Sequence, residues 1–268
     1  MPSLGRFHYL EAVPSSATPR REVRTLVLVH AFPLNAEMWR PQLALAERGW
    51  RVIAPDLRGM GESPADRTVE RMDDYVGDLV DLLDGLHVER AVIGGLSLGG
   101  YVTLALFKHV PSYFTGMILA DTRPQADTAE GIEGRKKMLA LLAQDGVQGV
   151  IEQMLPKLLG ETTRRERPEI SEAIRRVARE NHPEGVAGAL RAMMTRADST
   201  GLLASIRCPT LIIVGSDDVL TPPELSRGMH EAIPGSTLQV IEGAGHLSNC
   251  ERSERFNEVV GEFLDRRV

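Results

Sequence analysis

The sequence contains only two cysteines, Cys208 and Cys250, among its 268 residues. Two cysteines form no disulfide framework and fit no metal-binding spacing, so we expect reduced thiols in a reducing cytosol. The seven histidines fall singly, without a His-Glu-x-x-His pair, which disfavours a metal enzyme. The sequence therefore predicts a protein that needs neither a metal ion nor another cofactor.

Long apolar runs and basic clusters are lacking as well. No apolar run approaches the roughly 18 residues of a membrane span, and the first 16 residues lack the features of a signal peptide. The 31 Lys and Arg residues are dispersed, and the formal net charge is −6. These features argue against nucleic-acid or membrane partners and predict a cytoplasmic protein, monomeric or homodimeric.

Short apolar runs alternate with helical patterns between residues 24 and 122. The runs are too short for helices, are rich in branched residues and abut Gly, Pro or Asp, which is typical of buried strands. Strands separated by helices imply parallel pairing through right-handed crossovers. The expected parallel strands are 25–29, 52–54, 91–93 and 117–120. A helix is expected at 72–86, between the second and third of these strands, and an antiparallel edge strand near 7–13.

The branched runs disappear between residues 123 and 200. Apolar residues there recur at helical spacing and are punctuated by Pro156, Pro168 and Pro183, which predicts two helical pairs. Strand patterns return at 211–214 and 238–241, before a final helix that includes 256–264. The chain is therefore expected to have an α/β core in two parts, 1–122 and 201–268, interrupted by an all-helical insertion, 123–200.

The sharpest local motif is Gly95-x-Ser97-x-Gly99, which lies between an expected strand and an expected helix. A tight turn of this kind presents a serine at the top of a sheet, and glycines on both sides let strand and helix approach closely. The serine also precedes a helix N-terminus, which favours developing negative charge. The alternative for the motif alone is a glycine-rich turn that binds a phosphate or only packs.

A serine nucleophile needs a histidine base that is oriented by an acid. His246 directly follows the last expected strand, within Gly243-Ala244-Gly245-His246, whereas His8, His87, His109, His182 and His230 are interpreted as surface or capping residues. Three acids follow strands at the edge where such folds bind ligands, namely Asp121, Asp217 and Asp218. The segment 30–33, His-Ala-Phe-Pro, follows the first parallel strand, where a second oxyanion N–H is expected.

With these motifs, the chain resembles the α/β-hydrolases of the carboxylesterase, enol-lactonase and non-haem haloperoxidase type over nearly its whole length. The resemblance implies an eight-stranded, mostly parallel sheet flanked by helices, with the insertion as a cap over the site. It places the acid three residues after Gly215, on Asp218, and leaves Asp121 as the alternative. It also assigns the oxyanion role to the backbone N–H groups of Phe32 and Leu98.

One residue departs from the family pattern, because Ala31 stands where relatives usually have glycine after the histidine. Glycine suits a positive φ, so alanine implies either an ordinary φ or strain near the oxyanion hole.

The resemblance predicts a serine esterase that cleaves a small carboxylic ester or lactone through an acyl-enzyme on Ser97, with Asp218 and His246 completing a catalytic triad. The same residues would serve an enol-lactonase, a thioesterase, a C–C bond hydrolase or a perhydrolase. A receptor that binds its ligand without turnover is the alternative outside enzymes. Dehalogenases and epoxide hydrolases are disfavoured, because relatives with that chemistry carry Asp where Ser97 stands.

Overall fold

The computed structural model describes residues 3–15 and 23–268. Its strands form one sheet in the order β1-β2-β4-β3-β5-β6-β7-β8, in which the strands from β4 to β8 run parallel. The predicted eight-stranded, mostly parallel sheet is therefore confirmed. The strands are β1 (Ser3–Leu4), β2 (Phe7–Ala12), β3 (Thr25–Val29), β4 (Arg51–Pro55), β5 (Ala91–Leu96), β6 (Phe114–Ala120), β7 (Thr210–Gly215) and β8 (Thr237–Ile241).

The first strand predicted from the sequence is antiparallel, as expected, but it does not form the edge. β2 pairs with β4 on one side, and the two-residue strand β1 pairs with its other side. Two residues are too few to produce a periodic pattern, which is why β1 has no sequence signal.

The central strands are buried on both faces, because helices cover both sides of the sheet. Val27 and Ile93 point into one hydrophobic cluster with α1, α2 and α7, while Leu26 and Val92 point into the other with η1 and α9. This period-two alternation follows from strand geometry. The helices of these layers are the 3₁₀ helix η1 (Ala36–Arg48), α1 (Met72–Gly85), α2 (Leu98–His109), α7 (Pro223–Ala232) and α9 (Ser253–Arg267).

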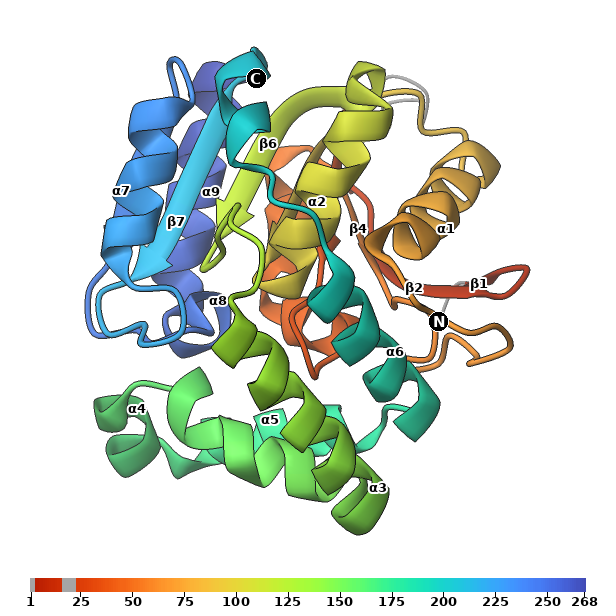
Figure 1. The fold of residues 1–268 in the computed structure, drawn as a ribbon. Helices are drawn as coiled ribbons and strands as arrows, with labels where there is room; N and C mark the ends of the chain where they lie inside the picture. The colour runs from red at the N-terminus through yellow and green to blue at the C-terminus, as the bar shows by residue number, and fades with distance from the viewer. Residues whose placement is uncertain (1–2, 16–22) are drawn as a thin grey trace.

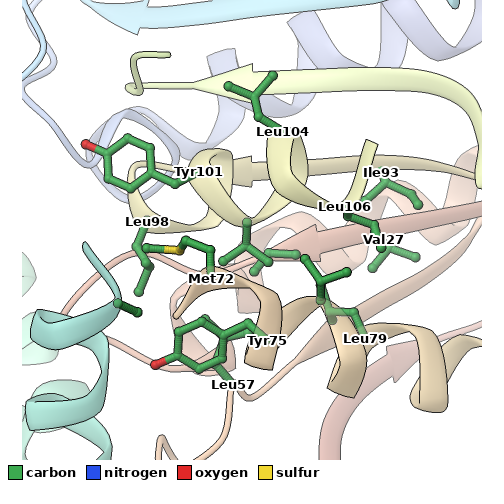
Figure 2. Close-up of a cluster of buried hydrophobic side chains, with 14 of the residues drawn as sticks. Val27, Leu57, Met72, Tyr75, Leu79, Ile93, Leu98, Tyr101, Leu104 and Leu106 are labelled. Atoms are coloured by element: carbon green, nitrogen blue, oxygen red, sulfur yellow. The ribbon is translucent and has the colours of Figure 1, made fainter. Parts of the chain in front are cut away.

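Helix α1 packs on α2 through its apolar face. Figure 2 shows Met72, Tyr75 and Leu79 of α1 directed toward the cluster that includes Leu98, the first residue of α2. Tyr75 and Leu98 are completely buried. The packing of α1 therefore fixes the start of α2, which directly follows Ser97.

Four helices cross the end of the sheet toward which the parallel strands point (Figure 1). They are α3 (Ala129–Leu158), α4 (Glu161–Glu166), α5 (Pro168–Arg179) and α6 (Pro183–Thr195), and all fall within the predicted insertion. α3 comprises two helical segments joined at Gly146, where φ is 65°. The short, polar α4 is an addition to the expected helical pairs.

Helices α3–α6, here called the helical layer, contact the rest of the molecule, here called the sheet half, through the backbones of Gly59 and Gly185. A Cβ placed on Gly185, in the first turn of α6, would lie 2.0 Å from the carbonyl oxygen of Gly59. The same carbonyl accepts a hydrogen bond from the His182 N–H at 3.1 Å. Asn181 adds a second link, since its Oδ1 accepts from the Gly61 N–H at 2.7 Å.

The interpretation of His8 as a surface or capping residue is wrong. The side chain is 7% exposed and its Nδ1 bonds Asp56 Oδ2, and this hydrogen bond raises the pKa of His8. Asp56 also accepts the backbone N–H groups of Ala36 and Glu62 at 2.7 and 3.0 Å. The pair thus organises the loop after β4, a role that strand-end position alone does not reveal.

Candidate active site

Ser97 occupies a strained turn between β5 and α2, with φ 55° and ψ −111°. A positive φ is costly for a residue with a side chain, and such strain concentrates at functional sites. The flanking glycines are required by space. A Cβ on Gly95 would lie 2.2 Å from the carbonyl carbon of Gly99, and a Cβ on Gly99 would lie 2.0 Å from the Val29 oxygen. The sequence reason for the motif is therefore the close approach of β3, β5 and α2.

Three hydrogen bonds hold this turn in place. The Ser97 N–H donates to the Ala120 carbonyl at 3.0 Å, and the Ser97 carbonyl accepts from the Tyr101 N–H at 3.2 Å. The Thr122 hydroxyl donates to the same carbonyl at 2.8 Å. Ser97 itself is half-buried while both of its neighbours are buried, so its side chain is the accessible point of the turn.

Phe32 and Leu98 bring two backbone donors to the same edge of the sheet. Leu98 is the first residue of α2, and Phe32 follows β3, the neighbour of β5. Among the described residues, neither N–H group has a hydrogen-bond acceptor within the protein. Buried backbone N–H groups are normally paired, so these two are available to a ligand.

The substitution of Ala31 for the usual glycine leaves the backbone unstrained. Positive φ among non-glycine residues of the described chain is confined to His87, Ser97 and Asp121, so Ala31 has an ordinary φ. The preceding His30 is fully buried, and burial lowers its pKa. Its Nδ1 donates to the Ala31 carbonyl and its Nε2 accepts from the Leu57 N–H, both at 3.0 Å. A neutral His30 thus ties the loop after β3 to the loop after β4.

Asp218 and His246 lie together, although 28 residues separate them in the chain. Asp218 follows β7 and His246 follows β8, which is its parallel neighbour. His246 Nδ1 lies 2.8 Å from Asp218 Oδ2, and the side chains are 3% and 0% exposed. Thr221 supports the carboxylate with its N–H to Oδ1 at 3.0 Å and its hydroxyl to Oδ2 at 2.5 Å.

These contacts keep Asp218 ionised. Burial is the largest single influence and opposes ionisation, but the charge and hydrogen bond of His246, together with the bonds from Thr221, outweigh it, so the pKa of Asp218 is lowered. A carboxylate facing Nδ1 selects the tautomer that carries its proton there, which leaves Nε2 as the basic nitrogen.

The two alternative acids have other partners. Asp217 is exposed and accepts the Ser216 hydroxyl at 2.7 Å. Asp121 is fully buried, accepts the Gly215 N–H at 2.8 Å and bonds the Ser248 hydroxyl. Burial and then the nearby charge of Asp218 raise the pKa of Asp121. Asp121 therefore links the loops that carry Asp218 and His246, and among the described residues the carboxylate bonded to the imidazole is that of Asp218.

Glu251 is a buried carboxyl that the sequence reasoning missed. It accepts the N–H groups of Gly160 and Gly245, each at 2.9 Å, and is completely buried. Gly160 lies between α3 and α4, while Gly245 precedes His246. Burial raises the pKa of Glu251, and the hydrogen bonds oppose that rise. The side chain of Thr163, in α4, is a further hydrogen-bond partner. No local pattern marks this glutamate, because its partners are backbone groups and a threonine side chain that the fold brings to it.

The described residues contain no group of three or more His, Cys, Asp or Glu side chains placed to hold a metal ion. In the same residues, no helix is both long and apolar enough to cross a membrane.

The sheet order, the turn at Ser97 and the helical layer over the strand ends define an α/β-hydrolase. A model of the alpha/beta hydrolase fold family matches residues 24–253, and the chain belongs to that family. The 3-oxoadipate enol-lactonase 2 of Acinetobacter baylyi is 29% identical over 241 residues, which cover 90% of this chain and 88% of that protein.

Two solved structures resemble this chain over almost its full length. A thermophilic esterase from Thermogutta terrifontis, with malate bound, has a TM-score of 0.90 and 37% identity, covering 97% of this chain and 93% of that one. The enol-lactonase from Burkholderia xenovorans LB400 has a TM-score of 0.87 and 27% identity, covering 97% and 96%. The protein is accordingly an enzyme, a hydrolase of the α/β-hydrolase superfamily with esterases and enol-lactonases among its relatives.

Proposed function

We propose that the protein is a serine hydrolase that cleaves a small carboxylic ester or lactone through an acyl-enzyme on Ser97. The observation that carries the proposal is the convergence of a strained, accessible serine with two unpaired backbone donors and a buried His246–Asp218 pair at one edge of the sheet. The names of the relatives, esterase and enol-lactonase, agree with this substrate class.

In the proposed reaction, Ser97 Oγ attacks the substrate carbonyl carbon while His246 Nε2 takes the hydroxyl proton. Asp218 stabilises the imidazolium that forms. The oxyanion of the tetrahedral intermediate accepts hydrogen bonds from the Phe32 and Leu98 N–H groups, and each such donor contributes roughly 10²–10³ in rate. The C–O bond then breaks, and the leaving alkoxide takes the proton from His246.

Deacylation repeats these steps with water as the nucleophile. His246 Nε2 removes a proton from water, the hydroxide attacks the acyl carbon, and Ser97 leaves as the alcohol after regaining the proton.

The helices of segment 123–200 are proposed as the cap that limits access of bulk water and shapes the acyl pocket, with 1–122 and 201–268 as the two parts of the core. Enol-lactone, thioester, C–C bond and perhydrolysis substrates use the same proposed residues and remain the alternatives.

The test is Ser97→Ala, with Ser205→Ala as the matched control because Ser205 is exposed and distant in sequence from the site residues. A fluorophosphonate should label the wild type and the control on Ser97 and leave Ser97→Ala unlabelled. Hydrolysis of p-nitrophenyl esters from acetyl to octanoyl should show kcat lowered by about 10⁵–10⁶ in Ser97→Ala. Undiminished activity in that variant would overturn the assignment. Labelling without turnover of any ester, lactone or thioester would favour a ligand receptor.

A further inference from the structure

A cavity of about 350 Å³ lies along α2, outside the residues assigned above to catalysis. It runs from Tyr101, in the first turn of α2, to His109 at the helix end, and it is closed by the start of α1 and by segment 196–202. Its volume is within the range of small-molecule sites. Segment 196–202, which lines the cavity, follows α6 and passes in front of α2 in Figure 1.

The end of the cavity at Tyr101 carries an excess of positive charge. Arg123 and Arg196 line it, and both pair with Asp127 Oδ1, at 3.0 and 3.3 Å. Arg135 pairs with the other oxygen of the same carboxylate. Burial is the largest single influence on Asp127 and acts to raise its pKa, but the three arginines together outweigh burial, so the pKa is lowered. Three guanidinium groups therefore share one carboxylate.

The remaining charged groups offset the charge of this cluster only in part. Lys108 is a third basic side chain of the lining, after Arg123 and Arg196. Asp73 lies at the far end, where it pairs with His109 at 3.1 Å. Asp198 lies near Arg196 but accepts the backbone N–H groups of Thr200 and Ala126, at 2.7 and 3.3 Å.

Arg196 is more deeply buried than Arg123, and among the described residues each of them has Asp127 as its single ionic partner. The Arg196 side chain is 4% exposed, and Asp127 is its only hydrogen-bond acceptor among the described residues. Its Nε is buried without an acceptor, as is the Nε of Arg123. The guanidinium is held 3.9 Å above the ring of Tyr101, which fixes its plane. A buried cation with so few acceptors is unfavourable unless an anion completes its surroundings.

We propose that this cavity binds a small organic carboxylate, with the carboxylate at Arg123 and Arg196 and a short apolar chain along α2. A guanidinium of fixed plane matches the two oxygens of a carboxylate. The apolar part of the lining, Met72, Leu104, Ala105 and Leu202, suits a hydrocarbon chain better than it suits a bare inorganic anion. The Tyr101 N–H bonds the Ser97 carbonyl, so the charged end of the site is one helical turn from the proposed nucleophile.

The binding test uses the Ser97→Ala variant, so that it does not depend on hydrolysis. Calorimetry at low ionic strength with pentanoate should give saturable 1:1 binding, at least tenfold tighter than with 1-pentanol or inorganic phosphate. Adding Arg196→Gln to this variant should weaken the binding of pentanoate at least tenfold. The control is Arg165→Gln, at an arginine that is 65% exposed and outside the lining, and it should leave the affinity for pentanoate unchanged. No pentanoate binding, equal binding after Arg196→Gln, or a preference for phosphate would overturn the proposal.

If Arg196→Gln does not fold, Leu202→Trp provides the second variant, because it fills the cavity and leaves the Asp127 cluster intact. It should abolish pentanoate binding while the Tm stays within a few degrees of the parent. Pentanoate binding that survives a folded Leu202→Trp variant would place the carboxylate elsewhere.

A kinetic arm, which rests on the proposed hydrolase function, distinguishes two sources of the carboxylate. The p-nitrophenyl esters of pentanoic acid and of glutaric acid, esterified at one end, have the same chain length and differ in the free carboxylate. If the carboxylate is part of the substrate, Arg196→Gln should lower kcat/KM for the glutarate ester at least tenfold relative to the pentanoate ester. If the ratio of the two kcat/KM values is unchanged while pentanoate still binds to the parent protein, the ligand of the site is a free carboxylate that is not part of the substrate. If neither ester is hydrolysed while pentanoate binds, the proposed function fails and the site stands.

Discussion

Replacing Glu251 with glutamine tests whether the helical layer helps to position His246. The carboxylate is completely buried and accepts two backbone N–H groups, from Gly160 and Gly245, at 2.9 Å. Glutamine keeps one acceptor oxygen but turns an NH₂ group toward the other N–H. A hydrogen bond to a charged group contributes about 1.5–3 kcal/mol, and an unpaired buried donor costs about 1–3 kcal/mol.

Part of this loss is offset, because the neutral amide avoids the cost of burying a charge. We therefore expect Glu251→Gln to lower the free energy of unfolding by about 2–4 kcal/mol, which corresponds to a fall in Tm of roughly 5–12 °C. The matched control is Glu258→Gln in α9, where the exposed carboxylate pairs with Arg255 at 3.1 Å. An exposed pair of this kind contributes no more than about 1 kcal/mol.

Activity provides the readout that separates positioning from stability. Gly245 precedes His246, the proposed base, and a displacement of about 1 Å at a catalytic group costs up to about 10²-fold in rate. At a temperature where both proteins are fully folded, kcat for the best p-nitrophenyl ester should fall about 10–100-fold in Glu251→Gln, with KM changed less than threefold. Urea denaturation measures the stability term. A variant with wild-type kcat and an unfolding free energy within 0.5 kcal/mol of the parent would refute the reasoning.

Asp218→Asn should lower kcat by about 10⁴, because an amide no longer selects the required imidazole tautomer; circular dichroism checks that the fold is kept, and a loss below tenfold argues against the role. Gly99→Ala should lose about 3 kcal/mol or more in urea denaturation, since its Cβ would lie 2.0 Å from a backbone oxygen of β3; unchanged stability contradicts this geometry. Burial raises the pKa of Cys208, and raises that of Cys250 to about 12. Ellman's reagent at pH 8 should therefore react with neither thiol until the protein is unfolded, and fast reaction of the native protein would show that the thiols are accessible.

Features that depend on local sequence were predictable. The run 25–29 reproduces β3 residue for residue, because a strand buried on both faces is continuously apolar and branched. The turn at Ser97 was located from its two glycines and the flanking strand and helix. Asp218 and His246 follow adjacent parallel strands, so the topology accounts for their proximity once the strand order is known.

Features that depend on tertiary partners were not predictable from the sequence. Nothing near Glu251 indicates that two loops point backbone N–H groups at it. The burial of His8 depends on Asp56, which lies 48 residues away. The arginines that share Asp127 come from both ends of the helical segment, and their common partner is visible only when the chain is folded.

The contact between Gly59 and Gly185 has a consequence for protein engineering. Each glycine lies against the backbone of the other, so neither position accepts even a methyl group without moving the opposing segment. The starting point of α6 is therefore set by a loop of the sheet half, and the two segments cannot be varied independently. A chimaera that receives its helical layer from a homologous enzyme should carry the loop 56–63 from the same donor. Exchanging 123–200 alone would join two surfaces that were shaped for different neighbours.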